Sequence, residues 1–152
     1  MKKLLLSCCL LAFSSSAAAK VGFVDVEAIV ATLMSQPEVA TMVNERFKGR
    51  IERIERLKED VSRSKTNPAN TSSGLSNLEK TLALETTSLQ LDVDEYTVKI
   101  RTGFLNKVRD ALNEMKDKKG YEAILDRNTA VIFDSQHDLT KSVHDVVAVT
   151  SN

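Results

Sequence analysis

Cysteine is almost absent from this chain of 152 residues, and its scarcity limits the chemistry available. Both cysteines, Cys8 and Cys9, lie within the first nineteen residues. From Lys20 onward the chain therefore has no thiol that could form a disulfide, coordinate a metal or act as a nucleophile. A chain of this kind depends on packing or on oligomerisation for its stability.

Catalytic and metal-binding patterns are missing as well. The two histidines, His137 and His144, are seven residues apart, which does not suit a pair of metal ligands on one helix. The sequence has neither a G-x-S-x-G motif nor a glycine-rich phosphate loop. Asp25 and Glu27 resemble a carboxylate pair, but a helix cap at the end of a strand explains them better. We therefore expect no enzymatic activity, no catalytic residue, no metal and no cofactor.

Neither sign of charge dominates the sequence, which contains 21 lysines and arginines and 21 aspartates and glutamates. Without Lys2 and Lys3, which fall in the N-terminal segment, 19 basic residues remain against 21 acidic ones. A formal charge of −2 gives no support for nucleic-acid binding.

Residues 1–19 have the pattern of a cleaved signal peptide. Lys2 and Lys3 precede an apolar run of about ten residues, too short to span a bilayer, and a run of alanines ends at Ala19. We expect cleavage before Lys20. A lipoprotein anchored at Cys8 is the minor alternative, because the apolar run before that cysteine is shorter still.

Helix breakers are rare over residues 38–119, which make up more than half of the chain. Their one dense cluster lies at residues 66–74 and contains Pro68 and Gly74. Two long helices joined at a tip near residues 66–74 are therefore predicted. Gly49, in the middle of the first helix, suggests close packing or a bend, since glycine destabilises a helix by about 1 kcal/mol relative to alanine.

Two apolar rows, each with a seven-residue interval, run along the second predicted helix. A plain two-helix coil needs only one such row, so the other belongs to a second buried face or to an exposed apolar face. Which row lies in the helix–helix seam stays open at this point. The candidates for the seam or for an exposed binding face, including two residues of the first helix, are Ile51, Ile54, Leu82, Leu84, Leu89, Leu91, Tyr96 and Val98.

The flanking regions, residues 20–37 and 120–152, are predicted to form a small body. Residues 20–26 have the β-branched and aromatic composition of a strand, and Asp25 is placed to cap a short helix that follows. Residues 121–125 and 129–133 are predicted to form two strands of a hairpin. A last helix begins at Asp138, with Leu139, Val143, Val146 and Val147 on its inner side. The expected fold class is α+β, mainly α.

Three segments in this order and spacing resemble the Skp/OmpH-like family of periplasmic chaperones: KVGFVDV near Lys20, FKGR in the first long helix, and YEAILDRNTAVIFDSQHDLTKSV near the C-terminus. The resemblance covers nearly all of the chain after residue 19. It implies a periplasmic homotrimer whose β-body, built from strands of both termini, carries three helical tentacles around a cavity. Seven residues are predicted to form the core of the body or the trimer contact: Val21, Phe23, Val24, Val26, Ile124, Val131 and Phe133.

The resemblance also implies the function of an ATP-independent holdase, which sequesters unfolded outer-membrane proteins between the tentacles. The alternative is a structural coiled-coil or adaptor protein of the cell envelope that binds a folded partner. The best-known family member is strongly basic, whereas residues 64–98 here contain two lysines and five acidic residues. This difference weakens the case for contact with anionic lipid or lipopolysaccharide.

Overall fold

The computed structural model describes residues 20–66 and 72–149 of the chain. The predicted signal peptide, residues 1–19, lies outside the described residues, as do residues 67–71 of the predicted hairpin tip.

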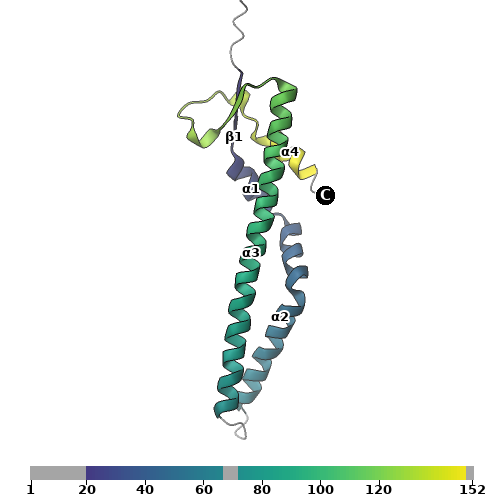
Figure 1. Ribbon diagram of the computed structural model, residues 1–152, viewed down its shortest axis with the longest axis vertical. Coiled ribbons are helices and arrows are strands. Elements are labelled where there is room, and N and C mark those ends of the chain that lie inside the picture. Colours follow the sequence, from purple (N-terminus) through teal and green to yellow (C-terminus); the bar gives the residue numbers. More distant parts are fainter. Residues whose placement is uncertain (1–19, 67–71, 150–152) are drawn as a thin grey trace, which may run out of the picture.

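A long antiparallel hairpin of two helices forms most of the molecule, as predicted (Figure 1). Helix α2 spans Pro37–Thr66 and helix α3 spans Ser72–Lys119, with 48 residues in α3. At 1.5 Å per residue, α3 is roughly 70 Å long. Pro37 suits the first turn of α2 because its fixed φ fits a helix start, and Gly120 ends α3 with a φ of +66° that favours glycine.

The small body lies at the C-terminal end of α3 and contains the first strand and the last helix of the described chain (Figure 1). Strand β1, Val21–Val24, pairs in parallel with strand β2, Ala123–Asp126. Helix α1, Val26–Met34, and helix α4, Thr140–Val149, pack against each other and against the body end of α3. The fully buried side chains of the body come from these three helices: Ile29, Val30, Leu33, Val108, Val143 and Val147.

Gly22 in β1 leaves room for the side chains of Leu139 and Tyr121 to pack against the strand. A Cβ atom at Gly22 would lie 2.8 Å from Cδ1 of Leu139 and 3.3 Å from the Tyr121 ring. Any side chain there would displace two residues that belong to the core. The other glycine that the sequence singled out, Gly49, behaves differently. A Cβ atom there would meet nothing within 4 Å, and α2 continues through it, so the predicted close packing at Gly49 is wrong.

The predicted strand over residues 129–133, and with it the predicted hairpin, is wrong. The chain turns after β2 into a short 3₁₀ helix, Arg127–Thr129, which begins where the Asp126 carboxylate accepts the backbone N–H of Asn128. The hairpin prediction assumed a partner close in sequence, whereas the actual partner of β2 is β1, about a hundred residues earlier. A second 3₁₀ helix, Ser135–His137, precedes α4.

The last helix differs from its prediction in two details. It begins at Thr140, and Asp138 accepts the backbone N–H of Thr140 from two residues upstream, at 2.9 Å. Val146 was expected on the inner side but is 40% exposed, while Leu139, Val143 and Val147 are buried.

The seven residues predicted for the body core or trimer contact have very different surroundings. Val24 is buried and Val131 is fully exposed, whereas Val21, Phe23, Val26, Ile124 and Phe133 are half-buried. Phe23 and Phe133 pack together with ring centroids 5.5 Å apart. Their role in assembly stays a prediction.

Candidate functional site

The seam of the hairpin consists of one apolar row from each helix. The buried residues of α2 along the seam are Phe47, Ile54 and Val61, at intervals of seven. In α3, the row that contains Leu82, Leu89 and Tyr96 is half-buried. The rings of Phe47 and Tyr96 meet edge to face, with centroids 5.8 Å apart, where the two rows come together.

Polar residues that interrupt the seam row of α3 have partners on α2. Asp92 pairs with Arg50, which also donates a hydrogen bond to the Ser88 hydroxyl at 3.1 Å. Glu85 pairs with Arg53 at 3.1 Å, and Glu79 pairs with Lys65 at 3.0 Å. Exposed ion pairs of this kind contribute little to stability but fix which residues lie opposite one another. The signal for these pairs in the sequence is an acidic residue, Glu85 or Asp92, within an otherwise apolar row.

The second row of α3 lies outside the seam and is exposed where α3 runs beside α2. The exposed fractions are 72% for Leu84, 65% for Leu91 and 62% for Val98. Residues at intervals of seven share a helix face, so these three side chains form one line, here called the outer row. Nearer the body the same line continues through Leu105 and Leu112, which pack against the core.

The structure divides seven of the eight residues that the sequence left undivided into two groups. Ile54, Leu82, Leu89 and Tyr96 belong to the seam, and Leu84, Leu91 and Val98 form the outer row. Ile51, on α2, belongs to neither group and is 37% exposed. Large apolar side chains in a line along an exposed helix face are unusual on a soluble protein and mark a surface for contact with other apolar groups.

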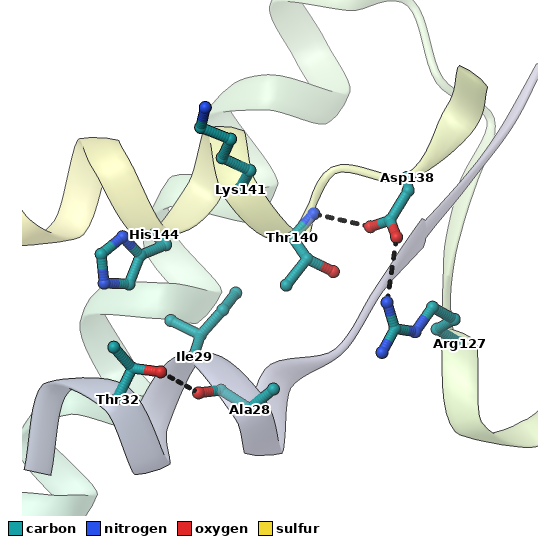
Figure 2. Close-up of a pocket in the computed structure, with 8 residues that line it drawn as sticks. All are labelled: Ala28, Ile29, Thr32, Arg127, Asp138, Thr140, Lys141 and His144. Carbon is teal, nitrogen blue, oxygen red and sulfur yellow. Dashed lines mark hydrogen bonds and ion pairs between the residues drawn. The ribbon is translucent and has the colours of Figure 1, made fainter. Parts of the chain in front are cut away.

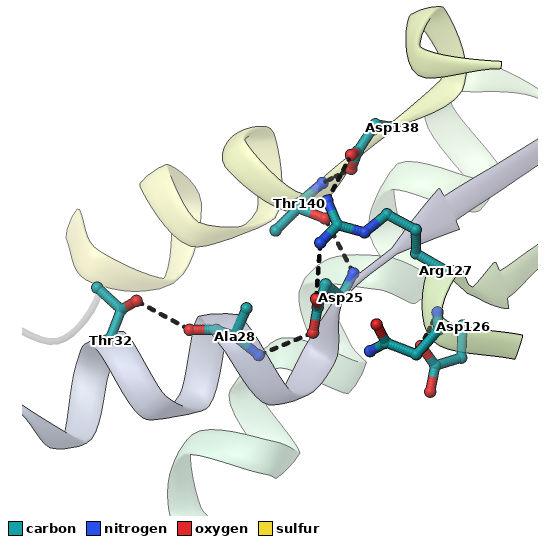
Figure 3. A network of polar contacts seen from close by, with 8 residues as sticks. Asp25, Ala28, Thr32, Asp126, Arg127, Asp138 and Thr140 are labelled. Atoms are coloured by element: carbon teal, nitrogen blue, oxygen red, sulfur yellow. Dashed lines mark hydrogen bonds and ion pairs between the residues drawn. The ribbon is translucent and has the colours of Figure 1, made fainter. Parts of the chain in front are cut away.

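A cluster of polar side chains lies within the body, at the base of the hairpin (Figure 3). The Asp25 carboxylate accepts the backbone N–H of Ala28 at 2.9 Å and thereby caps α1, as predicted. Arg127 donates to Asp25 at 2.8 Å and to Asp138 at 3.1 Å. The Thr140 hydroxyl accepts the backbone N–H of Asp25 at 2.9 Å. The cluster thus joins β1, the turn after β2 and the start of α4.

Both carboxylates of this cluster are held in the charged form. The hydrogen bond from the Ala28 backbone, assisted by Arg127, lowers the pKa of Asp25 against the opposing effect of burial. Burial is the largest single effect on Asp138 and raises its pKa, but hydrogen bonds from Thr140 and Arg127 together outweigh it, so the pKa of Asp138 is lowered. Glu27, the other predicted cap candidate, instead pairs with Arg101 of α3 at 2.6 Å.

A cleft of about 560 Å³ lies between α1 and α4 (Figure 2). Ala28, Ile29 and Thr32 form one side of the cleft, and Lys141 and His144 lie on the other. Nδ1 of His144 is 3.3 Å from Asp145, and its buried Nε2 has no hydrogen-bond partner among the described residues.

Residues 20–66 and 72–149 lack two further features. They contain no group of three or more histidine, cysteine, aspartate or glutamate side chains arranged to hold a metal. None of the helices in these ranges combines the length and the apolar character that crossing a bilayer requires.

Comparisons with known proteins show what this chain is similar to. The family model described as outer membrane protein (OmpH-like) matches residues 20–146. "Chaperone protein Skp" of Yersinia enterocolitica is 26% identical over 146 residues, which cover 88% of this chain and 89% of that protein. A crystal structure described as an OmpH-like outer membrane chaperone from Caulobacter crescentus has a TM-score of 0.47 at 14% identity, over 88% of this chain and 86% of that chain.

Proposed function

The chain belongs to the OmpH-like outer membrane protein family, whose members include Skp-type chaperones, and on that premise we propose that it is an ATP-independent holdase. Its clients would be outer-membrane proteins that are still unfolded in the periplasm. The proposal includes removal of residues 1–19 as a signal peptide, assembly of three copies, and capture of the client between the three hairpins.

The outer row carries this proposal. Leu84, Leu91 and Val98 expose more than half of their surfaces, and no core of the described chain covers them. Burying one such side chain against an apolar segment contributes about 1.5–3 kcal/mol at most, which suits reversible binding. An unfolded chain has exposed apolar segments but no fixed surface, and a line of separate apolar contacts does not require one.

The spacing of the outer row also suits a client without fixed structure. Adjacent members are seven residues apart, or roughly 10 Å along the helix axis. Several segments of a flexible client can therefore contact different members at once. After the first contact has formed, the other segments are held near the row at a high effective concentration, so several weak contacts together bind the client more tightly than one. Sequestration of this kind requires no bond to be made or broken, and thus neither a nucleotide nor a catalytic residue.

The test is the aggregation of an unfolded outer-membrane β-barrel protein after dilution from urea, followed by light scattering. The chain beginning at Lys20 is expected to slow aggregation at a small molar excess over the client. The triple variant Leu84→Gln, Leu91→Gln, Val98→Gln is expected to lose most of this effect, because glutamine keeps the helix but removes the apolar contacts.

A matched control changes three exposed positions of α3, also seven apart, on a different face: Ser76→Gln, Ala83→Gln and Gln90→Ala. This control should suppress aggregation as well as the unaltered chain does. If the unaltered chain left the client aggregating as fast as buffer, the holdase proposal would be abandoned. Stable binding to one folded envelope protein, without suppression of aggregation, would support the adaptor alternative instead.

A further inference from the structure

The outer row of α3 has two gaps between its members, and only one of them is flanked by charge. On a helix, the residues three and four positions after a given residue are its surface neighbours, and they lie on opposite sides of the line to the residue seven positions on. In the gap after Leu91 these neighbours are Asp94 and Glu95, and both are exposed. The line from Leu91 to Val98 is therefore apolar at both ends and has a carboxylate on each side.

The gap nearer the start of α3 has no charge at the equivalent positions. There the neighbours of Leu84 are Thr87 and Ser88. The Ser88 hydroxyl accepts a hydrogen bond from Arg50 of α2 at 3.1 Å. The two gaps thus have similar apolar ends, and the main difference between them is the charge of the flanking residues.

Asp94 and Glu95 also differ from the other acidic residues in the first half of α3. Each of the other three pairs with a cation of α2: Glu79 with Lys65, Glu85 with Arg53, and Asp92 with Arg50. Asp94 accepts a hydrogen bond from the Gln90 amide at 2.8 Å, and within the described chain neither Asp94 nor Glu95 forms an ion pair. These two charges are therefore not neutralised by the fold and are open to a ligand.

Three cations lie near Glu95 without pairing with it. Glu95 lines a cleft of about 420 Å³ between α2 and α3 together with Arg46, Arg50 and Lys99. Arg50 is paired within the seam, and the Arg46 guanidinium lies 5.9 Å from the centre of an aromatic ring of α3. Lys99, one turn further along α3, is exposed and is the cation that a ligand competes with at Glu95. Asp94 is not part of the cleft lining, so its side of the outer row is the more negative one.

We propose that the gap between Leu91 and Val98 is a subsite for a lysine or arginine of the client, held between Asp94 and Glu95. The complementary charge identifies this occupant, and apolar client residues on either side of the cation contact the two members of the outer row. Lysine and arginine suit the gap because their hydrocarbon stems pack along apolar surface while the charged end reaches a carboxylate. This inference rests on the proposed function and names the class of client segment that the outer row prefers.

The dimensions of the gap predict the spacing of residues in such a segment. Alternate residues of an extended chain point to the same side, so an apolar residue, a cation and a second apolar residue at alternate positions face the helix together. Their four steps span at most about 13 Å at roughly 3.3 Å per residue. That reach is sufficient, because Leu91 and Val98 are roughly 10 Å apart along the helix axis. A segment of the form Leu-Ser-Lys-Ser-Leu has this pattern.

The experiment measures the binding of three unfolded polypeptides to the chain beginning at Lys20, by fluorescence anisotropy. The polypeptides repeat Leu-Ser-Lys-Ser-Leu, Leu-Ser-Gln-Ser-Leu or Leu-Ser-Glu-Ser-Leu between glycines, so that their apolar content is the same. We expect the lysine form to bind about fivefold more tightly than the glutamine form, as two exposed ion pairs predict, and the glutamate form to bind most weakly. The preference should disappear in 1 M salt, where the screening length is about 3 Å.

A double variant and a control of equal charge locate the preference. Asp94→Asn, Glu95→Gln keeps the outer row and removes both carboxylates, so it should bind the three forms about equally. The control Glu52→Gln, Glu59→Gln makes the same change in net charge at two exposed positions of α2 that form no ion pair within the described chain. It should keep the preference for the lysine form. Circular dichroism checks that both variants remain helical.

Equal binding of the three forms by the unaltered chain would overturn the inference, as would a preference that survives in the Asp94, Glu95 variant or is lost in the control. The aggregation assay, run on the same preparations, separates these outcomes from failure of the proposed function. Suppressed aggregation without a preference for the lysine form contradicts the subsite alone. A preference for the lysine form in a chain that leaves the client aggregating contradicts the holdase alone, and binding of none of the three forms contradicts both.

Discussion

At the scale of single residues, Asp25 makes both a local contact and contacts with residues far away in the sequence. Its carboxylate caps α1 through Ala28 and pairs with Arg127, while its backbone N–H donates to Thr140. The cap was predictable because it requires only an aspartate between a strand and a helix. The partnership with Arg127 was not, since 102 positions separate the two residues and no local pattern connects them.

The lowered pKa of Asp25 predicts how stability depends on pH. A carboxyl whose pKa is lower in the folded chain contributes stability that is complete above its unfolded pKa of about 4 and disappears as the pH falls through the folded value. Asp25→Asn keeps a capping side chain but loses the charge. We therefore expect the variant to be less stable than the unaltered chain at pH 7, and the difference to shrink at pH 3.

Urea unfolding of both chains at the two pH values, followed by circular dichroism, measures this difference. A stability gap that stayed constant or widened in acid would show that the charge of Asp25 does not stabilise the body.

At the scale of secondary-structure elements, the two rows of α3 mark what the sequence could and could not predict. Two rows at seven-residue intervals were evident, but they have the same spacing and similar residues, so periodicity alone could not assign one of them to the seam. The assignment depends on α2, where Arg50 and Arg53 lie opposite Asp92 and Glu85. Matching of charges between helices far apart in sequence is therefore the information that was missing.

The failed hairpin in the body has a related cause. Residues 121–125 and 129–133 are close in sequence and have the composition of strands, which favours a local pairing. In the structure β2 instead pairs with β1, near the other end of the chain. Residues 130–134 form neither a helix nor a strand. Long-range parallel pairing leaves no local signal, whereas the long helices, their breaker cluster and their caps are all encoded locally.

Two isoleucines of α2 provide a matched test of the seam. Ile54 is 5% exposed and Ile51 is 37% exposed. Ile54→Ala should lower the free energy of unfolding by about 2–4 kcal/mol, because it leaves a cavity in the seam. Ile51→Ala removes the same atoms from a partly exposed site and should cost less than about 1 kcal/mol.

Urea unfolding and amide hydrogen exchange of α2 measure the two effects. Equal losses of stability, or a larger loss at Ile51, would mean that the seam does not run through Ile54.

At the scale of the whole molecule, the two apolar rows of α3 differ in exposure. The seam row packs against α2 within the hairpin, whereas the outer row is exposed, and we propose that the outer row binds the client. The family and the helical hairpin were predictable from the sequence, because segments and their order resemble a known family along the chain. Which surface performs which task was not, since it depends on exposure in the folded chain.

The most direct test of the central claim places a photo-crosslinking amino acid at Leu91 of the outer row or at Gln90, its exposed neighbour on a different face of α3. Each protein is mixed with an unfolded outer-membrane β-barrel protein, irradiated, and analysed by gel electrophoresis and mass spectrometry. We expect strong crosslinking to the client from position 91 and weak crosslinking from position 90. Equal crosslinking from the two positions, or none from position 91 while aggregation is still suppressed, would mean that the outer row does not bind the client.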